Sequence, residues 1–282
     1  MYRKIFIDKY LHSGFEFEEA KNEVDFALDV LFNYSYKDFM LGKTLEPWQL
    51  AKLEKVFNER VSTRRPIQQI VGQAFFYNRK YFVNEYTLVP RPETELLVSE
   101  VLAIAKEFEN PKVLDIGTGT GCIPISLVLE NSEIEAESVD ISIDAIETAE
   151  KNALLHNIYE KVKFIHSDLF EKVEGKYNII VSNPPYIPLK DKDSLQVEVR
   201  DFEPSSALFT TDEHGVEFYK KIIEQAKGYL LSGGYLLFEL GINQHLIVEK
   251  CLKDNGFSDI SVIQDFNSIE RIIVANMNIK KY

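Results

Sequence analysis

Between residues 112 and 275, short apolar runs alternate with longer amphipathic stretches, and this alternation limits the possible folds more than any other feature of the chain. The apolar runs predict seven strands, at residues 113–116, 134–139, 162–165, 177–181, 235–240, 260–264 and 271–275. The amphipathic stretches predict helices near residues 92–108, 122–129, 143–156, 216–230 and 244–254. Alternating strands and helices are typical of an α/β fold, with a mostly parallel sheet and helices on both faces. Two successive strands at the end predict an antiparallel edge strand.

The N-terminal part differs in character, because its apolar residues recur at helical spacing and strand signals are scarce. Helices are predicted at residues 16–34 and 47–61, and Pro47 suits a first helical position. We expect a small helical bundle whose aromatic residues, including Trp48, pack in its core. Residues 75–83 predict a β-hairpin with its turn at Asn78 and Arg79. The pattern predicts a helical domain at residues 1–64, a hairpin linker at 65–91 and an α/β domain at 92–282.

Composition restricts the class of protein. The chain has 282 residues, of which 45% are hydrophobic and 27% charged, as in soluble globular proteins. Its net charge of -13 argues against a generic nucleic-acid binder, because such binding needs Lys and Arg to neutralise phosphates. Cys122 and Cys251 form no disulfide framework, so we expect a reducing compartment. We recognise no signal peptide, membrane span or metal-ligand cluster, and therefore expect a cytoplasmic protein without a metal.

The motif Asn183-Pro184-Pro185-Tyr186 directly follows one of the predicted strands. Proline lacks the N–H group that a sheet needs, so the motif places Asn183 on a stiff turn at the carboxyl end of the strand. Ligands of open α/β sheets bind at such ends. The Asn183 side chain and the Pro184 carbonyl can accept both hydrogens of an NH2 group, and Tyr186 can cover a flat group there. On its own, such a motif is more often a proline-rich turn that caps a strand.

A glycine-rich turn, Asp115-Ile116-Gly117-Thr118-Gly119-Thr120-Gly121, lies upstream between a predicted strand and a predicted helix. Its glycines permit a tight turn and let a ligand approach the backbone. The spacing G-x-G-x-G departs from the dinucleotide fingerprint G-x-G-x-x-G, and Cys122 occupies the place of the third glycine. A purely structural turn is a fair interpretation of this spacing alone.

Acidic residues close the next two strands. Asp140 stands about 20 residues after the turn, where an acid commonly holds ribose hydroxyls. An adenine ring could lie against Leu169 while Asp168 meets its amine, although a solvated loop acid is an equally good interpretation of Asp168.

An acid that binds ribose fits NAD or S-adenosylmethionine. We find no constellation for hydride transfer and no G-x-S-x-G nucleophile elbow. An NH2-gripping turn beside an adenosyl cofactor instead indicates methyl transfer onto nitrogen.

The glycine turn and the Asn183 motif together resemble the Rossmann-like methyltransferases that modify planar NH2 groups through an [N/D]PPY motif. Further stretches resemble the glutamine branch of that group, the peptide-chain release factor glutamine methyltransferases (the PrmC/HemK family). These stretches are Pro66-Ile67-Gln68-Gln69-Ile70-Val71-Gly72, the hairpin with Phe75 to Tyr77, Val89-Pro90-Arg91-Pro92-Glu93-Thr94-Glu95 and Glu198-Val199-Arg200-Asp201-Phe202-Glu203-Pro204. The resemblance runs from about residue 64 to residue 275. It departs at Thr210-Thr211, where the family usually has paired glycines.

The resemblance implies a class I S-adenosylmethionine methyltransferase fold with a mostly parallel seven-stranded sheet, joined by a hairpin linker to a small N-terminal helical bundle that recognises release factors. It implies methylation of the side-chain amide nitrogen of the glutamine in the GGQ motif of release factors, with S-adenosyl-L-homocysteine as product and no metal. We expect release factors as partners, no direct nucleic-acid or membrane binding, and a monomer. The main rival is an [N/D]PPY-type adenine methyltransferase acting on nucleic acid, which would need base flipping and a basic channel. A non-catalytic adapter with this fold would have no need of the Asn183 turn.

The resemblance also assigns roles to individual residues. Catalytic roles are expected for Asn183, Pro184 and Tyr186. Cofactor contacts are expected from Gly117, Thr118, Gly119, Thr120, Gly121, Asp140, Asp168, Leu169 and Asn183. Substrate contacts are expected from Asn183, Pro184, Pro185 and Tyr186.

Overall fold

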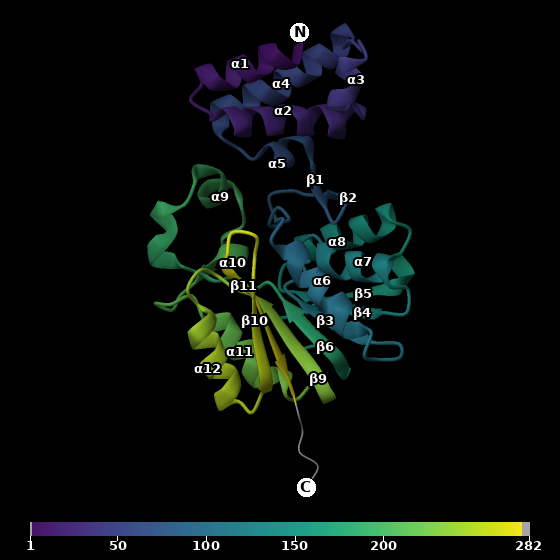
Figure 1. The fold of residues 1–282 in the computed structure, drawn as a ribbon, viewed down its shortest axis with the longest axis vertical. Helices are drawn as coiled ribbons and strands as arrows, with labels where there is room; N and C mark the ends of the chain where they lie inside the picture. The colour runs from purple at the N-terminus through teal and green to yellow at the C-terminus, as the bar shows by residue number, and fades with distance from the viewer. Residues whose placement is uncertain (1, 278–282) are drawn as a thin grey trace. The chain divides into compact units, whose positions relative to one another are not determined.

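The computed structural model describes residues 2–277 of the chain, which form two compact units (Figure 1). The first unit contains the residues up to 73 together with Gln196–Phe202. The second contains residues 74–195 and the chain from 203 onward, and it carries the main sheet. In the described part of the chain, no helix is long and apolar enough to cross a membrane.

The first unit is helical. Its helices are α1 (Tyr2–His12), α2 (Phe17–Phe32), α3 (Tyr36–Met40), α4 (Pro47–Thr63), α5 (Ile67–Val71) and α9 (Val197–Phe202). Helix α2 buries Ala20, Val24 and Leu28, because their spacing places them on one helical face. The backbone N–H of Glu46 donates to the side chain of Gln49, which closes the first turn of α4. Both helices predicted in this region are confirmed.

Trp48 does not pack in the core of this unit, contrary to our expectation. It is 62% exposed and lies edge-on to the ring of Phe32, with the ring centroids 5.6 Å apart. The buried face of α4 runs through Gln49, Leu53 and Phe57. Trp48 precedes Gln49 by one residue, which turns it about 100° away from that face.

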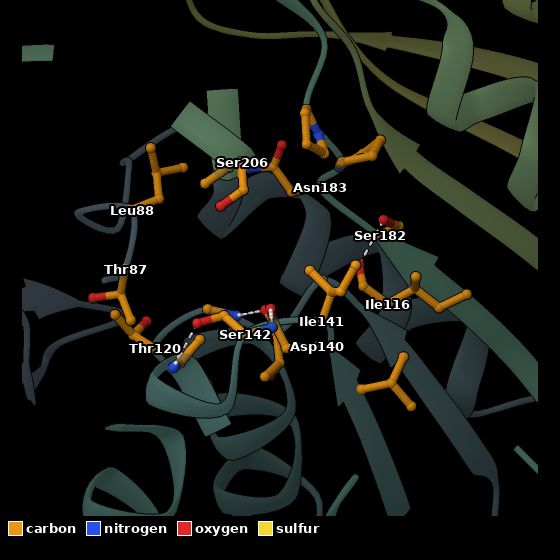
Figure 2. A pocket seen from close by; sticks show the side chains of 18 of the residues that line it. Thr87, Leu88, Ile116, Thr120, Asp140, Ile141, Ser142, Ser182, Asn183 and Ser206 are labelled. Atoms are coloured by element: carbon orange, nitrogen blue, oxygen red, sulfur yellow. Dashed lines mark hydrogen bonds between the residues drawn. The ribbon is translucent and has the colours of Figure 1, made fainter. Parts of the chain in front are cut away.

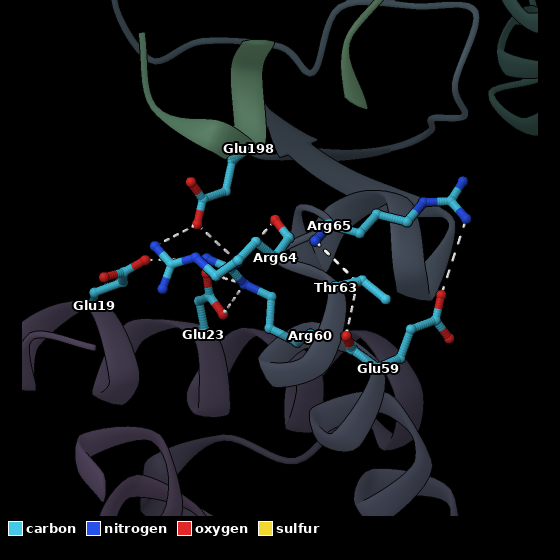
Figure 3. A network of polar contacts seen from close by, with 8 residues as sticks. All are labelled: Glu19, Glu23, Glu59, Arg60, Thr63, Arg64, Arg65 and Glu198. Atoms are coloured by element: carbon cyan, nitrogen blue, oxygen red, sulfur yellow. Dashed lines mark hydrogen bonds and ion pairs between the residues drawn. The ribbon is translucent and has the colours of Figure 1, made fainter. Parts of the chain in front are cut away.

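Arg60, near the end of α4, organises a cluster of ion pairs inside the first unit (Figure 3). Its side chain is 2% exposed and lies 2.8 Å from Glu23, 3.0 Å from Glu19 and 2.9 Å from Glu198. Burial raises the pKa of Glu23, although its hydrogen bond with Arg60 acts in the opposite direction. Because Glu198 belongs to α9, the cluster fixes α9 to α2 and α4.

A seven-stranded sheet in the order β10-β11-β9-β6-β3-β4-β5 forms the centre of the second unit. The strands are β3 (Lys112–Ile116), β4 (Glu135–Asp140), β5 (Val162–His166), β6 (Tyr177–Ser182), β9 (Leu230–Glu239), β10 (Ser258–Gln264) and β11 (Glu270–Asn276). All seven correspond to predicted strands, and the mostly parallel sheet is confirmed.

The antiparallel strand lies one position away from where we expected it. It is β11, which pairs antiparallel with both β9 and β10, so the edge of the sheet is β10. The connection from β9 to β10 skips one position, and the short turn after β10 lets β11 fill that gap.

Helices cover both faces of the sheet (Figure 1). One face packs against α6 (Thr94–Ala105), α7 (Cys122–Glu130) and α8 (Ile143–Leu155), and the other against α11 (Glu217–Ala226) and α12 (His245–Asp254). Strand β9 shows the alternation: Leu237 joins the first core, whereas Leu236 and Phe238 join the second.

Smaller elements fill the connections. Strands β1 (Gln73–Phe76) and β2 (Arg79–Phe82) form the predicted hairpin, with its turn at Tyr77 and Asn78, one residue earlier than predicted. Both turn residues have positive φ, 48° and 59°, as a two-residue type I′ turn requires. The loop predicted between residues 181 and 216 contains α9 and further short elements. These are β7 (Ile187–Pro188), the 3-10 helix η2 (Leu189–Ser194), α10 (Ser205–Leu208) and β8 (Phe209–Thr210), and another 3-10 helix, η1 (Tyr159–Lys161), precedes β5.

Candidate active site

The glycine turn and the Asn183 turn begin side by side at the carboxyl ends of two paired strands. Ile116 ends β3 and lies opposite Ser182, the last residue of β6, in the parallel register. The Ser182 hydroxyl donates to the carbonyl of Ile116 at 2.7 Å, which links the two strand ends directly. Strand β3 also lies where the chain order reverses, between β4 and β6, and open α/β sheets bind ligands at such switch points.

A pocket of about 250 Å³ opens at these strand ends. Figure 2 shows Asn183 and Ser206 along its upper side and Asp140 and Ser142 along its lower side. The predicted site residues that line it are Gly117, Thr118, Gly119, Thr120, Asp140, Asp168, Leu169, Asn183, Pro184 and Pro185. Gly121 and Tyr186 do not line it.

The three glycines of the turn have different surroundings. Gly117 and Gly119 have φ of +80° and +53°, and the space that a side chain would occupy at each is open. Their backbone is therefore accessible to a bound molecule. A Cβ on Gly121 would instead lie 3.0 Å from the Cβ of Ala149 on α8. Gly121 thus permits close packing between α7 and α8.

Asp140 stands at the end of β4 with its carboxylate held by the backbone. It accepts from the N–H groups of Gly119 and Ser142, each at 2.9 Å. Burial raises the pKa of Asp140, and these hydrogen bonds oppose that rise. A carboxylate has about four acceptor sites, so both oxygens keep capacity for a ligand hydroxyl.

Asp168 and Leu169 form the next part of the wall after β5. Leu169 has φ of 45°, a left-handed conformation that leucine rarely adopts. Asp168 is exposed. Such backbone conformations cluster at ligand sites, where the surrounding structure holds them in place.

Hydrogen bonds to Thr94, and through it to Glu239, hold the Asn183 side chain in place. Its Nδ2 donates to the hydroxyl of Thr94 at 3.3 Å, and that hydroxyl donates to Glu239 at 2.6 Å. Glu239 is 2% exposed, and burial raises its pKa to about 7, although the Thr94 hydrogen bond acts against the rise.

Tyr186 packs partly buried against the α11–α12 core and is not among the residues that line the pocket. Gln244 donates to the Tyr186 carbonyl at 2.8 Å. A Cβ on Gly241 would lie 2.9 Å from the Tyr186 ring, and a Cβ on Gly215 would lie 2.1 Å from the Tyr186 carbonyl oxygen. Two glycines and one glutamine therefore fix the end of the turn.

The stretch after Thr210, which departs from the family pattern, is ordered by side-chain capping. The Thr211 hydroxyl donates to Glu217 at 2.7 Å. Asp212 accepts from the backbone N–H groups of Val216 and Glu217, at 3.0 and 3.1 Å. Asp212 therefore satisfies two backbone N–H groups at the start of α11.

Sequence reasoning missed Thr94, Glu239 and Gln244, which hold the Asn183 turn in place. Glu239 carried a usable signal, since it is an acid inside the otherwise apolar run of a predicted strand. Thr94 lies in a stretch that resembles the family, but its residue type indicated no role, and Gln244 carried no signal. Among residues 2–277, no group of three or more His, Cys, Asp or Glu side chains is arranged to hold a metal ion.

Comparisons with known proteins agree with this geometry. The methyltransferase small domain family matches residues 92–201. A release factor glutamine methyltransferase of Fusobacterium nucleatum is 37% identical over 255 residues, which cover 89% of this chain and 72% of that protein. One from Chlorobaculum tepidum is 40% identical over 217 residues and 73% of each protein. The crystal structure of a methyltransferase from Pyrococcus furiosus shares the fold, with a TM-score of 0.53 and 16% identity over 81% of this chain and 99% of that one.

Proposed function

The chain belongs to the release factor glutamine methyltransferase family, and on that premise we propose that it transfers a methyl group from S-adenosylmethionine to the side-chain amide nitrogen of the GGQ glutamine in peptide chain release factors. One observation carries the proposal. The register of Ile116 with Ser182 brings the glycine turn and the Asn183 turn onto the wall of one pocket. Methyl transfer requires that the methyl donor and the nitrogen that accepts the methyl group bind next to each other, because the reacting atoms must come within a few ångström.

The pocket residues fit the parts of S-adenosylmethionine. The open backbone at Gly117 and Gly119 admits a close ligand, and Asp140 retains acceptor capacity for ribose hydroxyls. Leu169 supplies apolar surface for a base, with Asp168 beside it for an exocyclic amine. When bound, the cofactor supplies an electrophilic sulfonium methyl group.

Asn183 and Pro184 orient the substrate amide. An amide nitrogen is a poor nucleophile, because its lone pair is delocalised into the carbonyl group. The Asn183 side-chain oxygen and the Pro184 carbonyl accept its two N–H groups and aim the nitrogen at the methyl group. The nitrogen becomes acidic as it gains the methyl group, so it needs no strong base beforehand. Its proton would then pass to solvent, with S-adenosyl-L-homocysteine as the leaving group. Positioning and electrostatic complementarity account for the acceleration.

We propose that Tyr186 packs on the plane of the substrate amide. Its ring is partly buried against the α11–α12 core, so we also assign it the role of fixing the turn that carries Asn183. We propose that the helical domain, residues 1–64, recognises the release factor. The free Cys122 and Cys251 support a reducing compartment, and we place the enzyme in the cytoplasm.

The direct test is mass spectrometry of a release factor after incubation with the enzyme and S-adenosylmethionine. We expect a single methyl group on the GGQ glutamine. Unmodified glutamine after prolonged incubation with folded, cofactor-binding enzyme would overturn the proposed function.

Two variants separate the two halves of the site. We expect Asn183→Ala to abolish most methyl transfer while calorimetry still detects cofactor binding, because the lost acceptor belongs to the substrate side. Asp140→Ala should weaken cofactor binding by about 10- to 100-fold, since hydrogen bonds to a charged group contribute roughly 1.5–3 kcal/mol. Near-normal turnover by Asn183→Ala would show that Asn183 does not orient the substrate. Unchanged cofactor affinity in Asp140→Ala would show that Asp140 does not bind the cofactor.

A further inference from the structure

Asn183 is the first member of a chain of hydrogen bonds that runs into the protein interior. Its Nδ2 donates to Thr94 Oγ1, and Thr94 Oγ1 donates to Glu239 Oε2. Thr94 is the first residue of α6 and Glu239 is the last residue of β9, so two rigid elements hold the chain. Thr94 is 3% exposed and Glu239 is 2% exposed, which keeps bulk water from competing for these bonds.

When Glu239 is ionised, the order of donors and acceptors in this chain has one consistent solution. An ionised carboxylate only accepts hydrogen bonds, so Glu239 takes the single hydrogen of the Thr94 hydroxyl. The Thr94 oxygen can then only accept, and it must meet the NH2 end of the Asn183 carboxamide. If the carboxamide were turned around, two oxygens without a hydrogen between them would face each other, which is unfavourable in a buried site.

We propose that Thr94 and Glu239 are positioning residues that determine which end of the Asn183 carboxamide faces the substrate. With the NH2 end held by Thr94, the side-chain oxygen is the end left to accept an N–H group of the substrate amide. The inference rests on the proposed function, because it assigns a task to Asn183 in that reaction. It adds that the geometry of the site depends on a carboxylate that does not line the pocket.

The stretch that contains Glu239 also fixes the other end of the turn. Gln244, five residues further on, donates to the carbonyl of Tyr186 at 2.8 Å and to that of His214 at 2.9 Å. Gln244 also accepts from the backbone N–H of Gly241 at 3.0 Å. One segment at the end of β9 therefore controls both the first and the last residue of the Asn183 turn.

The test compares Thr94→Val with Thr94→Ser. Valine keeps the shape of threonine but cannot accept from Asn183, whereas serine keeps the hydroxyl. We expect Thr94→Val to lower kcat for release factor methylation on the order of 100-fold, as misplacement of a reacting group typically does. The KM and the cofactor affinity should stay near their wild-type values, and Thr94→Ser should recover most of kcat.

Thr148→Val is the matched control. Thr148 is 2% exposed, and its hydroxyl donates to the Asp144 carbonyl within α8 and accepts from the Asn84 side-chain NH2 at 2.8 Å. The variant therefore also loses a buried hydroxyl, but one outside the pocket lining, and we expect it to keep the wild-type kcat. If Thr94→Val fails to fold, Glu239→Gln takes its place. An amide can either accept from Thr94 or donate to it, so the orientation of Asn183 becomes mixed and kcat should fall with cofactor affinity retained.

The outcomes separate this inference from the proposed function. Wild-type enzyme that leaves release factors unmethylated would defeat the proposed function itself. Active wild-type enzyme with an equally active, folded Thr94→Val variant would overturn the positioning role alone. The same holds if Thr94→Ser is as slow as Thr94→Val, if Thr148→Val loses as much as Thr94→Val, or if Glu239→Gln keeps full kcat.

Discussion

Two carboxyl groups near the pocket are removed from water without a directly bonded cation. Asp115 is 0% exposed and accepts from the hydroxyl of Ser138 at 2.7 Å, whereas Glu239 accepts from the hydroxyl of Thr94. A hydroxyl offsets only part of the cost of burying a carboxylate. Burial accordingly raises the pKa of each group to about 7, so their charge is sensitive to pH near neutrality.

Asp115 should make the stability of the fold depend on pH. Burial raises its pKa from 3.8 to about 7, so the folded state holds this proton more tightly than the unfolded chain. The stabilising contribution is therefore complete below about pH 4 and is lost as the pH rises through about 7. At about 1.36 kcal/mol per pKa unit, ionisation costs on the order of 4 kcal/mol. We expect Asp115→Asn to reduce the fall in unfolding free energy between about pH 5 and pH 8 in urea denaturation.

Glu239 should preserve part of the dependence of the unfolding free energy on pH in the Asp115→Asn variant. The pKa of Glu239 is raised to about 7 by burial as well, against the lowering effect of Arg271 and together with the raising effect of Glu93. Its ionisation remains in the Asp115→Asn variant, so the slope should shrink without vanishing. A slope equal to that of the wild type would show that Asp115 is not a titrating group in this range.

At the scale of elements, the periodicity of apolar residues predicted the strands and helices, which depend on short segments of chain. The seven strands and the helices that cover them were predictable because each buries an apolar stripe or run that is visible locally. The position of β11 was not, because pairing order depends on which gap the chain leaves in the sheet. The structure of residues 187–210 was also missed, since α9 is held by contacts that are remote in sequence. Arg60 bonds Glu198 across 138 residues, and Gln69 donates to the Phe202 carbonyl across 133.

In the candidate site too, features set by local sequence were predictable, whereas features set by remote contacts were not. Asn183, Asp140 and the glycine turn were predictable because each ends a strand, and parallel strands bring their carboxyl ends to one edge. Thr94 and Glu239 lie 145 residues apart, and no local pattern joins them. Gly121 belongs to the motif but serves helix packing, because a motif specifies a turn without specifying what lies beside each residue.

The Arg60 cluster should dominate the stability of the helical unit. Arg60→Met keeps an apolar stem but leaves Glu23, which is 14% exposed, without its cation, whereas Glu198 keeps its ion pair with Arg64 at 2.7 Å. Removing one partner of a buried ion pair typically costs about 3–5 kcal/mol. We expect faster amide hydrogen exchange in α2 and α4, measured by mass spectrometry.

Lys21→Met supplies the comparison for Arg60→Met. Lys21 pairs with Glu18 on the surface of α2, with side chains 38% and 68% exposed. Exposed pairs contribute about 1 kcal/mol or less, so exchange should change little. Equal effects of the two variants would contradict the assignment of Arg60 as the central charge of the unit.

At the scale of the whole molecule, charge favours a neutral substrate over a nucleic acid. The chain carries a net charge of -13. Arg91 on the pocket wall is paired with the buried Glu203 at 2.6 Å, so its charge is already compensated. Enzymes that act on single strands instead use a positively charged groove that follows the phosphate backbone. A glutamine side chain has no charge to neutralise, which agrees with a pocket built around Asn183.

We therefore expect nucleic acid neither to accept methyl groups from this enzyme nor to compete with a release factor for it. The assay follows label from S-adenosylmethionine into a release factor, with and without an excess of RNA or duplex DNA. Low salt, about 50 mM, is the condition that most favours binding of nucleic acid, because phosphate contacts strengthen as salt falls. A parallel reaction without release factor detects label in the nucleic acid itself. Label in adenine, or slower release factor methylation caused by RNA at this salt, would favour the nucleic-acid methyltransferase. We expect unchanged rates and unlabelled nucleic acid, because the molecule is acidic and the charge of Arg91 on the pocket wall is compensated.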